Sequence, residues 1–186
     1  MRLSKTIRTT AALLVFAMAW ALNGCCTYQG AASVSTESMI PEGEDSADFL
    51  DRTSELEVVD MDNALHGLCL LVDGEDTHAD FQSRVDAMNE KGLIPSNCTL
   101  EANQPLTKGE LAYMAYQACG VKEKGLMLSV FGPRKRYCLR ELQYRGMMAR
   151  GGGTMRVTGM EFVAVITRAD TYKRTGLFPN DVGQPE

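Results

Sequence analysis

The sequence predicts a mainly α-helical domain of about five helices, and two observations carry this prediction. Apolar residues recur at helical spacing in several segments after residue 61, as Phe81, Val85 and Met88 illustrate. Helix start signals such as Thr107 and glycines such as Gly120 bound these segments, and glycine is the residue that most often follows a helix end. The loops between the helices have room for short extended segments.

Composition and charge narrow the possible functions. The 186 residues are 45% hydrophobic and 23% charged, which is ordinary for a soluble globular protein. Residues 1–24 hold three of the 19 basic residues and none of the 24 acidic ones, so the rest of the chain has a net charge of −8. This balance argues against nucleic-acid binding, which requires a basic surface.

Residues 1–24 are organised like the signal peptide of a lipoprotein. A basic segment precedes the apolar run 11–22, whose 12 residues would cover about 18 Å as a helix, well short of a bilayer core of about 30 Å. Leu22-Asn23-Gly24-Cys25 then resembles a lipobox, where bacterial lipoproteins are cleaved and lipidated. The resemblance implies a membrane anchor on Cys25 in the cell envelope, at the outer membrane facing the periplasm or the cell surface. The alternative is an ordinary secretory signal.

Residues 25–61 are predicted to be a flexible acidic tether. Small polar residues fill its first part, and residues 42–62 contain nine acidic side chains against Arg52 alone. Such a segment is typical of a self-repelling, solvated linker. A calcium site is the alternative, although the spacing of an EF-hand loop is missing. Phe49 and Leu50 could begin to dock on the domain.

The predicted domain spans residues 62–175, with a C-terminal tail at 176–186. Asp62 is expected to cap a first helix that ends before Gly74. Thr77 to Asp80 resembles a capping box for a second helix, which places His78 in its first turn.

The later helices have stronger start signals. Thr107 with Glu110 and Thr158 with Glu161 form two full capping boxes, and Pro133 can occupy the first position of the helix between them.

Two stretches of the domain, 77–120 and 133–171, match each other. Each reads as a helix, a glycine turn, an extended loop and a capped helix, with Thr107 and Glu110 of the first stretch equivalent to Thr158 and Glu161 of the second. This arrangement resembles the S-layer homology (SLH) repeat, in which a Thr-Arg-Ala-Glu motif starts the second helix. The resemblance implies two helical hairpins that share one core and hold a cell-wall polymer. Lys108 and Gly159 replace the motif's arginine.

The cysteines of the domain leave three possibilities open. An even number of cysteines in an exported domain permits one or two disulfides, and the alternatives are buried free thiols or a metal site. The spacing contains no CxxC and no Cys–His pair at ligand spacing, so no metal site is predicted. The four cysteines are Cys69, Cys98, Cys119 and Cys138.

No catalytic site or cofactor is predicted. His66 and His78 are the only histidines, and the sequence contains no nucleophile elbow, zinc-protease motif or P-loop. An enzyme is therefore the class with the least support.

A basic cluster between residues 134 and 150 is the predicted contact surface. It could face anionic lipid headgroups, a charged glycan or an acidic protein, or it could be a solvated helix face. We expect a non-catalytic envelope lipoprotein that binds a cell-wall or surface polymer, and the alternative is an assembly factor that recruits another envelope protein. The predicted ligand-binding residues are Lys108, Arg134, Lys135, Arg136, Arg140 and Arg145.

Overall fold

The computed structural model describes residues 45–95, 98–121 and 125–181. The predicted signal peptide, Cys25 and the first part of the tether therefore lie outside the described residues. The chain divides into two units, residues 1–30 with 97–99 and residues 31–96 with 100–186, and the second unit contains every described helix. The described helices are α2 (Ser46–Ser54), α3 (Met61–Asp73), α4 (Phe81–Glu90), α5 (Lys108–Cys119), α6 (Leu126–Phe131), α7 (Lys135–Tyr144) and α8 (Gly159–Thr175).

The predicted fold class is confirmed, because the described residues of the second unit are mainly helical. The structure has seven described helices where about five were expected. Helices α2 and α6 account for the difference. None of the described helices combines the length and the apolar character that a membrane crossing requires.

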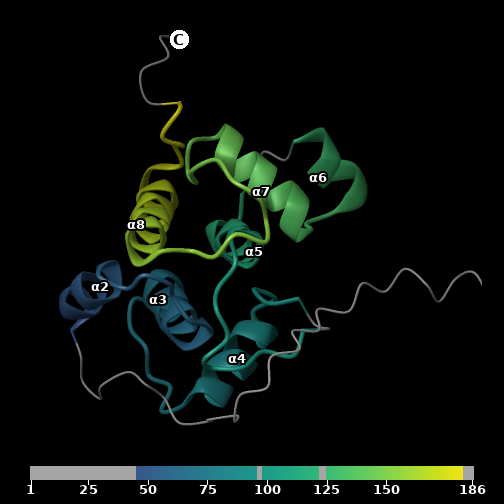
Figure 1. Ribbon diagram of the computed structural model, residues 1–186. Helices are drawn as coiled ribbons and strands as arrows, with labels where there is room; N and C mark the ends of the chain where they lie inside the picture. The colour runs from purple at the N-terminus through teal and green to yellow at the C-terminus, as the bar shows by residue number, and fades with distance from the viewer. Residues whose placement is uncertain (1–44, 96–97, 122–124, 182–186) are drawn as a thin grey trace, which may run out of the picture. The chain divides into compact units, whose positions relative to one another are not determined.

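Helices α3, α5 and α8 pack against one another at the centre of this unit (Figure 1). An outer helix covers each of them: α4 lies on α3, α7 on α5, and α2 on α8. The central helices bury apolar side chains completely, including Leu65, Leu111 and Phe162. Within the described residues, α4 does not pack on α5, nor α7 on α8, so each of these outer helices packs on a central helix that precedes it and not on its partner in the predicted hairpin.

A ring of three backbone hydrogen bonds joins the starts of the central helices. Val59 donates to Val157 O (2.9 Å), Val157 donates to Leu106 O (3.0 Å), and Leu106 donates to Val59 O (2.8 Å). Each of these buried residues immediately precedes the N-cap of a central helix. The ring fixes where all three helices begin.

Several predicted helix boundaries are confirmed. Thr107 and Glu110 form the expected capping box. Gly74 and Gly120 follow α3 and α5 in the left-handed conformation that glycine adopts without strain. Thr158 caps α8 by accepting from the amide of Glu161, but no reciprocal bond from that glutamate completes a box.

Other predicted boundaries are wrong. Asp60, and not Asp62, caps α3. Helix α4 begins after Asp80, whose capping box is formed with Ser83, so His78 lies in the preceding loop and not in a helical turn. Arg134 is the N-cap of α7, which places Pro133 outside the helix.

Part of the predicted tether is also wrong, because residues 46–54 form helix α2. Asp45 caps this helix, and Phe49 is completely buried. The start of α8 lies so close to α2 that a β-carbon on Gly159 would be only 1.8 Å from Thr53 O. This close approach explains why glycine occupies the position.

Candidate functional site

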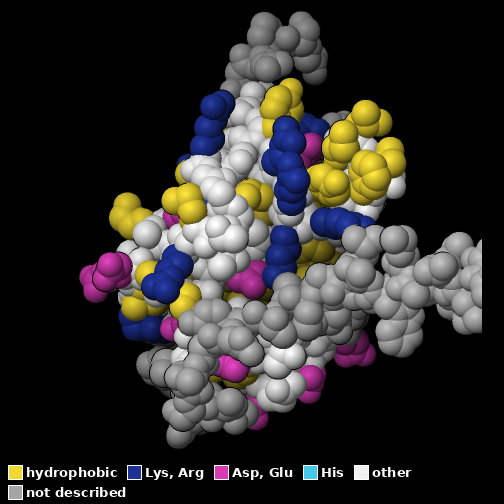
Figure 2. All heavy atoms as spheres, turned by 45° about the vertical axis from the view of Figure 1, so that its right-hand side comes forward, with side chains coloured by type: hydrophobic (Ala, Val, Ile, Leu, Met, Phe, Trp, Pro, Cys, Tyr) yellow, Lys and Arg dark blue, Asp and Glu magenta, His cyan; other side chains and the backbone are white. Residues whose placement is uncertain are grey.

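The basic face of α7 consists of Arg134, Arg136 and Arg140, which are exposed. Arg136 and Arg140 are separated by one helical turn and therefore lie on the same side of α7. None of the three forms an ion pair with any other residue that the structure describes. Figure 2 shows basic side chains gathered in this region, beside an apolar area. These three predicted contact residues remain available to a ligand.

The other three predicted contact residues form internal ion pairs. Lys108 is buried, with its Nζ 2.7 Å from Glu161 Oε1. Lys135 Nζ is 3.1 Å from Glu110 Oε1.

Arg145 Nε is 3.2 Å from Glu141 Oε1, and its guanidinium lies over the ring of Phe178. The structure therefore does not bring Lys108, Lys135 and Arg145 to the surface as a common contact site. The Lys108–Glu161 pair links α5 to α8, and the Lys135–Glu110 pair links α7 to α5.

Two tyrosines continue the basic face along α7. Tyr137 lies three residues before Arg140 and Tyr144 four residues after it, so the three side chains share one side of the helix. Tyr144 is 78% exposed. Arg140 and the two tyrosines therefore combine a positive charge with flat apolar surface on one side of α7.

An apolar patch on α6 adjoins the start of α7. Four apolar residues of this short helix are largely exposed, and only Leu128 is buried. Phe131 contacts Tyr137 with the ring centroids 5.8 Å apart, which links the patch to the tyrosines of α7. The exposed members of the α6 patch are Leu126, Met127, Val130 and Phe131.

A buried polar cluster joins α3 to α4, and sequence reasoning missed it. Arg84 of α4 is 4% exposed and pairs with two buried carboxylates. Its Nη1 is 2.7 Å from Asp62 Oδ1, and its Nε donates to Asp76 Oδ2. A buried arginine needs such partners because an uncompensated charge in the interior is costly.

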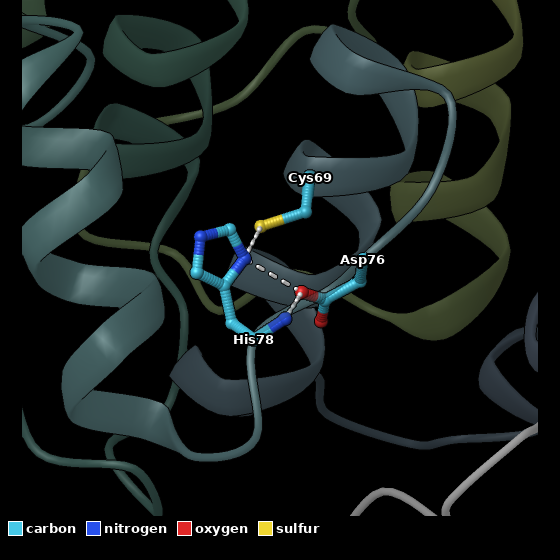
Figure 3. Close-up of side chains that lie close together, drawn as sticks. All are labelled: Cys69, Asp76 and His78. Atoms are coloured by element: carbon cyan, nitrogen blue, oxygen red, sulfur yellow. Dashed lines mark hydrogen bonds and ion pairs between the residues drawn. The ribbon is translucent and has the colours of Figure 1, made fainter.

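Asp76 also binds both histidines, and Figure 3 shows its contacts with His78. His66 Nδ1 is 2.6 Å from Asp76 Oδ2, and His78 Nδ1 is 2.9 Å from Asp76 Oδ1. The amide of His78 donates to the same Oδ1. Burial alone would raise the pKa of Asp76, but hydrogen bonds from His66, His78 and Arg84 outweigh it and hold that pKa well below its usual range.

Cys69 of α3 lies beside this carboxylate–histidine pair. Its Sγ is 3.9 Å from His78 Nδ1. Burial and the nearby charge of Asp76 raise the pKa of Cys69 to about 12, so the group is a neutral thiol near pH 7. Nucleophilic catalysis requires a thiolate, and this geometry therefore does not favour a cysteine–histidine catalytic pair.

No two of the four described cysteines form a disulfide with each other, and Cys69, Cys119 and Cys138 are free thiols, which is one of the alternatives that the sequence left open. Burial raises the pKa of Cys119 to about 12 and that of Cys138 to about 11. Thiols in such surroundings behave as small apolar side chains.

The low pKa of Asp76 predicts a pH dependence of stability. A carboxyl group whose pKa is lower in the folded state stabilises the fold above its unfolded pKa, and this contribution is lost as pH falls towards the folded pKa. The difference in unfolding free energy between the unmodified protein and Asp76→Asn should therefore be largest near pH 7 and shrink below about pH 4. Urea denaturation at a series of pH values measures it.

The exposed Asp86 provides the control. Asp86→Asn should change stability little at any of these pH values. A gap between the unmodified protein and Asp76→Asn that stays constant down to pH 2.5 would contradict the prediction.

Comparisons with known proteins found no matching family model, no matching curated protein and no matching solved structure.

Proposed function

We propose that this chain is a non-catalytic lipoprotein of the bacterial cell envelope that binds an anionic cell-wall or surface polymer through the basic face of α7. In this proposal Cys25 carries the lipid anchor, and the helical unit is built on SLH-like repeats. The exposure of Arg134, Arg136 and Arg140 is the observation that carries the proposal.

The shape of α7 supports a polymer as the ligand. A repeating anionic chain needs a linear row of donors, and Arg136 and Arg140 lie one turn apart on an exposed helix side. Tyr137 and Tyr144 continue the same side. Arginine donates up to five hydrogen bonds and pairs with carboxylates and phosphates in a bidentate manner.

The turns after α4 and α7 support the proposed repeats. Gly92 and Gly146 have φ angles of +69° and +77°, a conformation that other residues rarely adopt. After each glycine, the next amide donates to the carbonyl five residues earlier: Leu93 to Met88 (2.9 Å) and Met147 to Leu142 (2.8 Å). Equal hydrogen bonding at equivalent positions is what a duplicated unit would retain.

The ring at Val59, Leu106 and Val157 supports a third, more divergent unit formed by α2 and α3. Asp60 caps α3 where Thr107 and Thr158 cap the other central helices. The sequence pattern gave no sign of this unit, because neither the threonine nor the glutamate of the motif is present.

Co-sedimentation of the full chain with purified cell walls tests the proposal. Arg136→Glu/Arg140→Glu should weaken binding by at least about tenfold, because a basic residue facing an anionic surface contributes about 1 kcal/mol. Added salt should weaken binding of the unmodified protein for the same reason.

The control is Arg168→Glu/Arg174→Glu, an equal charge change at two exposed arginines of α8. Because Arg168 donates to Met147 O and Arg174 pairs with Asp170, urea denaturation checks that this control folds. Equal loss of binding in the two double variants would show attraction by net charge alone and would contradict a site on α7. Absence of sedimentation by the unmodified protein would overturn polymer binding.

The α6 patch favours the second candidate function, recruitment of another envelope protein. Four exposed apolar side chains beside arginines form a surface of the kind that protein partners cover. Co-purification of one envelope protein, abolished by Val130→Asp and without sedimentation on cell walls, would favour this function over polymer binding.

A further inference from the structure

We propose that Cys69, Asp76 and His78 form a binding site for a divalent transition metal, with Zn²⁺ as the ion that the donors suit best. This inference depends on side chains of α3 and of the loop between α3 and α4, and it is independent of the proposed polymer binding. The spacing of the three residues matches no common zinc motif, so only the fold brings them together.

The donor atoms already lie close to one another. Cys69 Sγ, a carboxylate oxygen of Asp76 and a ring nitrogen of His78 are all within 4.8 Å of one another. Donors on a tetrahedral zinc ion are separated by about 3.3–3.6 Å, given bond lengths of about 2.0–2.3 Å. The observed separations of 2.9 Å (His78 Nδ1 to Asp76 Oδ1) and 3.9 Å (Cys69 Sγ to His78 Nδ1) lie on either side of that range. The third separation, from Cys69 Sγ to a carboxylate oxygen of Asp76, is at most 4.8 Å, so seating an ion requires shifts of about 1 Å.

The backbone explains how the donors meet. Cys69 points inward from α3, which ends at Gly74 with a φ of +86°. The chain then turns back, so that Asp76 and His78 of the loop before α4 lie over the thiol (Figure 3). His78 is the most accessible of the three, with 22% of its side chain exposed against 1% for Asp76, whereas Cys69 is completely buried.

Hydrogen bonds from neighbouring side chains orient the Asp76 carboxylate, as is common for metal ligands. His66 Nδ1 and Arg84 Nε both bind Asp76 Oδ2, which leaves Oδ1 facing His78. Such outer hydrogen bonds fix ligand geometry, and their loss typically costs about 10–100-fold in metal affinity. The buried carboxylate of Asp62 offsets the charge of Arg84, so the guanidinium does not leave the region positively charged.

The chemistry of binding is an exchange of a cation for a proton. When the metal–sulfur and metal–nitrogen bonds form, the Cys69 thiol releases its proton to solvent. The proton that His78 Nδ1 donates to Asp76 Oδ1 moves to Nε2 of the neutral ring, and no electron is transferred. Because binding releases the thiol proton, affinity should rise with pH.

Cobalt titration of the reduced full chain tests the site. Co²⁺ should produce a sulfur-to-metal charge-transfer absorption with the visible bands of tetrahedral coordination, and one equivalent of Zn²⁺ should remove both. Cys69→Ser should lose the charge-transfer band. His66→Gln should retain it with affinity about 10–100-fold weaker.

Cys138→Ser is the matched control, because Cys138 is another completely buried thiol and it lies outside this cluster. It should bind Co²⁺ like the unmodified protein, as should Cys25→Ser/Cys26→Ser. Far-ultraviolet circular dichroism shows whether Cys69→Ser folds. Should it not, His78→Gln serves as the second variant and should lose tetrahedral binding.

Three results would each overturn the site. They are a folded unmodified protein without the charge-transfer band, a band that survives in Cys69→Ser, and a band that disappears in Cys25→Ser/Cys26→Ser.

Discussion

Replacing Arg84 by methionine should destabilise the protein by about 3–5 kcal/mol, because it removes the cation between two buried carboxylates. Asp62 and Asp76 are 0% and 1% exposed at their side chains, so water cannot replace the guanidinium. The midpoint of urea denaturation should fall accordingly, with little change in its slope.

Two further variants show whether charge is the cause. The double variant Arg84→Met/Asp62→Leu should be more stable than Arg84→Met, because it removes one of the stranded carboxylates. Arg140→Met changes an exposed arginine and should alter stability by no more than about 0.5 kcal/mol. Equal stability of Arg84→Met and the unmodified protein would mean that the buried ion pairs contribute nothing net.

Replacing Gly159 by alanine should lower the free energy of unfolding by about 2 kcal/mol or more. Two effects oppose each other at this position. Alanine favours a helix over glycine by about 1 kcal/mol. The added β-carbon would lie 1.8 Å from Thr53 O and 2.9 Å from the carbonyl carbon of Ser54, and overpacking against backbone costs about 3 kcal/mol.

The steric effect should therefore prevail and push α2 away from α8. Gly152→Ala is the control, because its β-carbon would meet nothing closer than 4.0 Å and its φ is not positive. Thermal and urea denaturation of the two variants measure the difference. A Gly159→Ala protein as stable as Gly152→Ala would contradict the packing of α2 on α8.

Features that depend on a few neighbouring residues could be predicted from the sequence. The cap at Thr107 and the left-handed glycines at 74 and 120 are examples, because each is formed within one turn of chain. The same reasoning placed the N-cap of α3 at Asp62. Asp60, two residues earlier, is an equally suitable capping residue. Asp60 became the cap because the ring hydrogen bond of Val59 fixes the start of the helix, and that bond is to Val157.

Helix α2 could not be predicted because its composition is that of a solvated acidic linker. One apolar side chain decides the outcome: Phe49 is completely buried and meets the ring of His66 edge-on at 4.4 Å between centroids. Its helix also lies against α8, more than a hundred residues along the chain. Local pattern carries no information on such a distant partner.

The candidate sites divide in the same way. The exposed arginines at 134, 136 and 140 stand out in the sequence, whereas the internal pairing of Lys108 with Glu161 depends on how α5 and α8 meet. The Arg84 cluster also needed the fold, since its members come from α3, a loop and α4. One sequence signal could have pointed to this cluster. Asp76 lies two residues before His78, in the short loop after the helix-ending Gly74.

The ring of Val59, Leu106 and Val157 links the starts of α3, α5 and α8 in a closed circuit of hydrogen bonds. In an open array of repeats each unit contacts only its neighbours, so units can be gained, lost or unfolded one at a time. Here the start of α3 is bonded to the starts of both α5 and α8, so displacing any one of the three would leave a donor and an acceptor without their partners. The three central helices should therefore unfold together instead of fraying from one end.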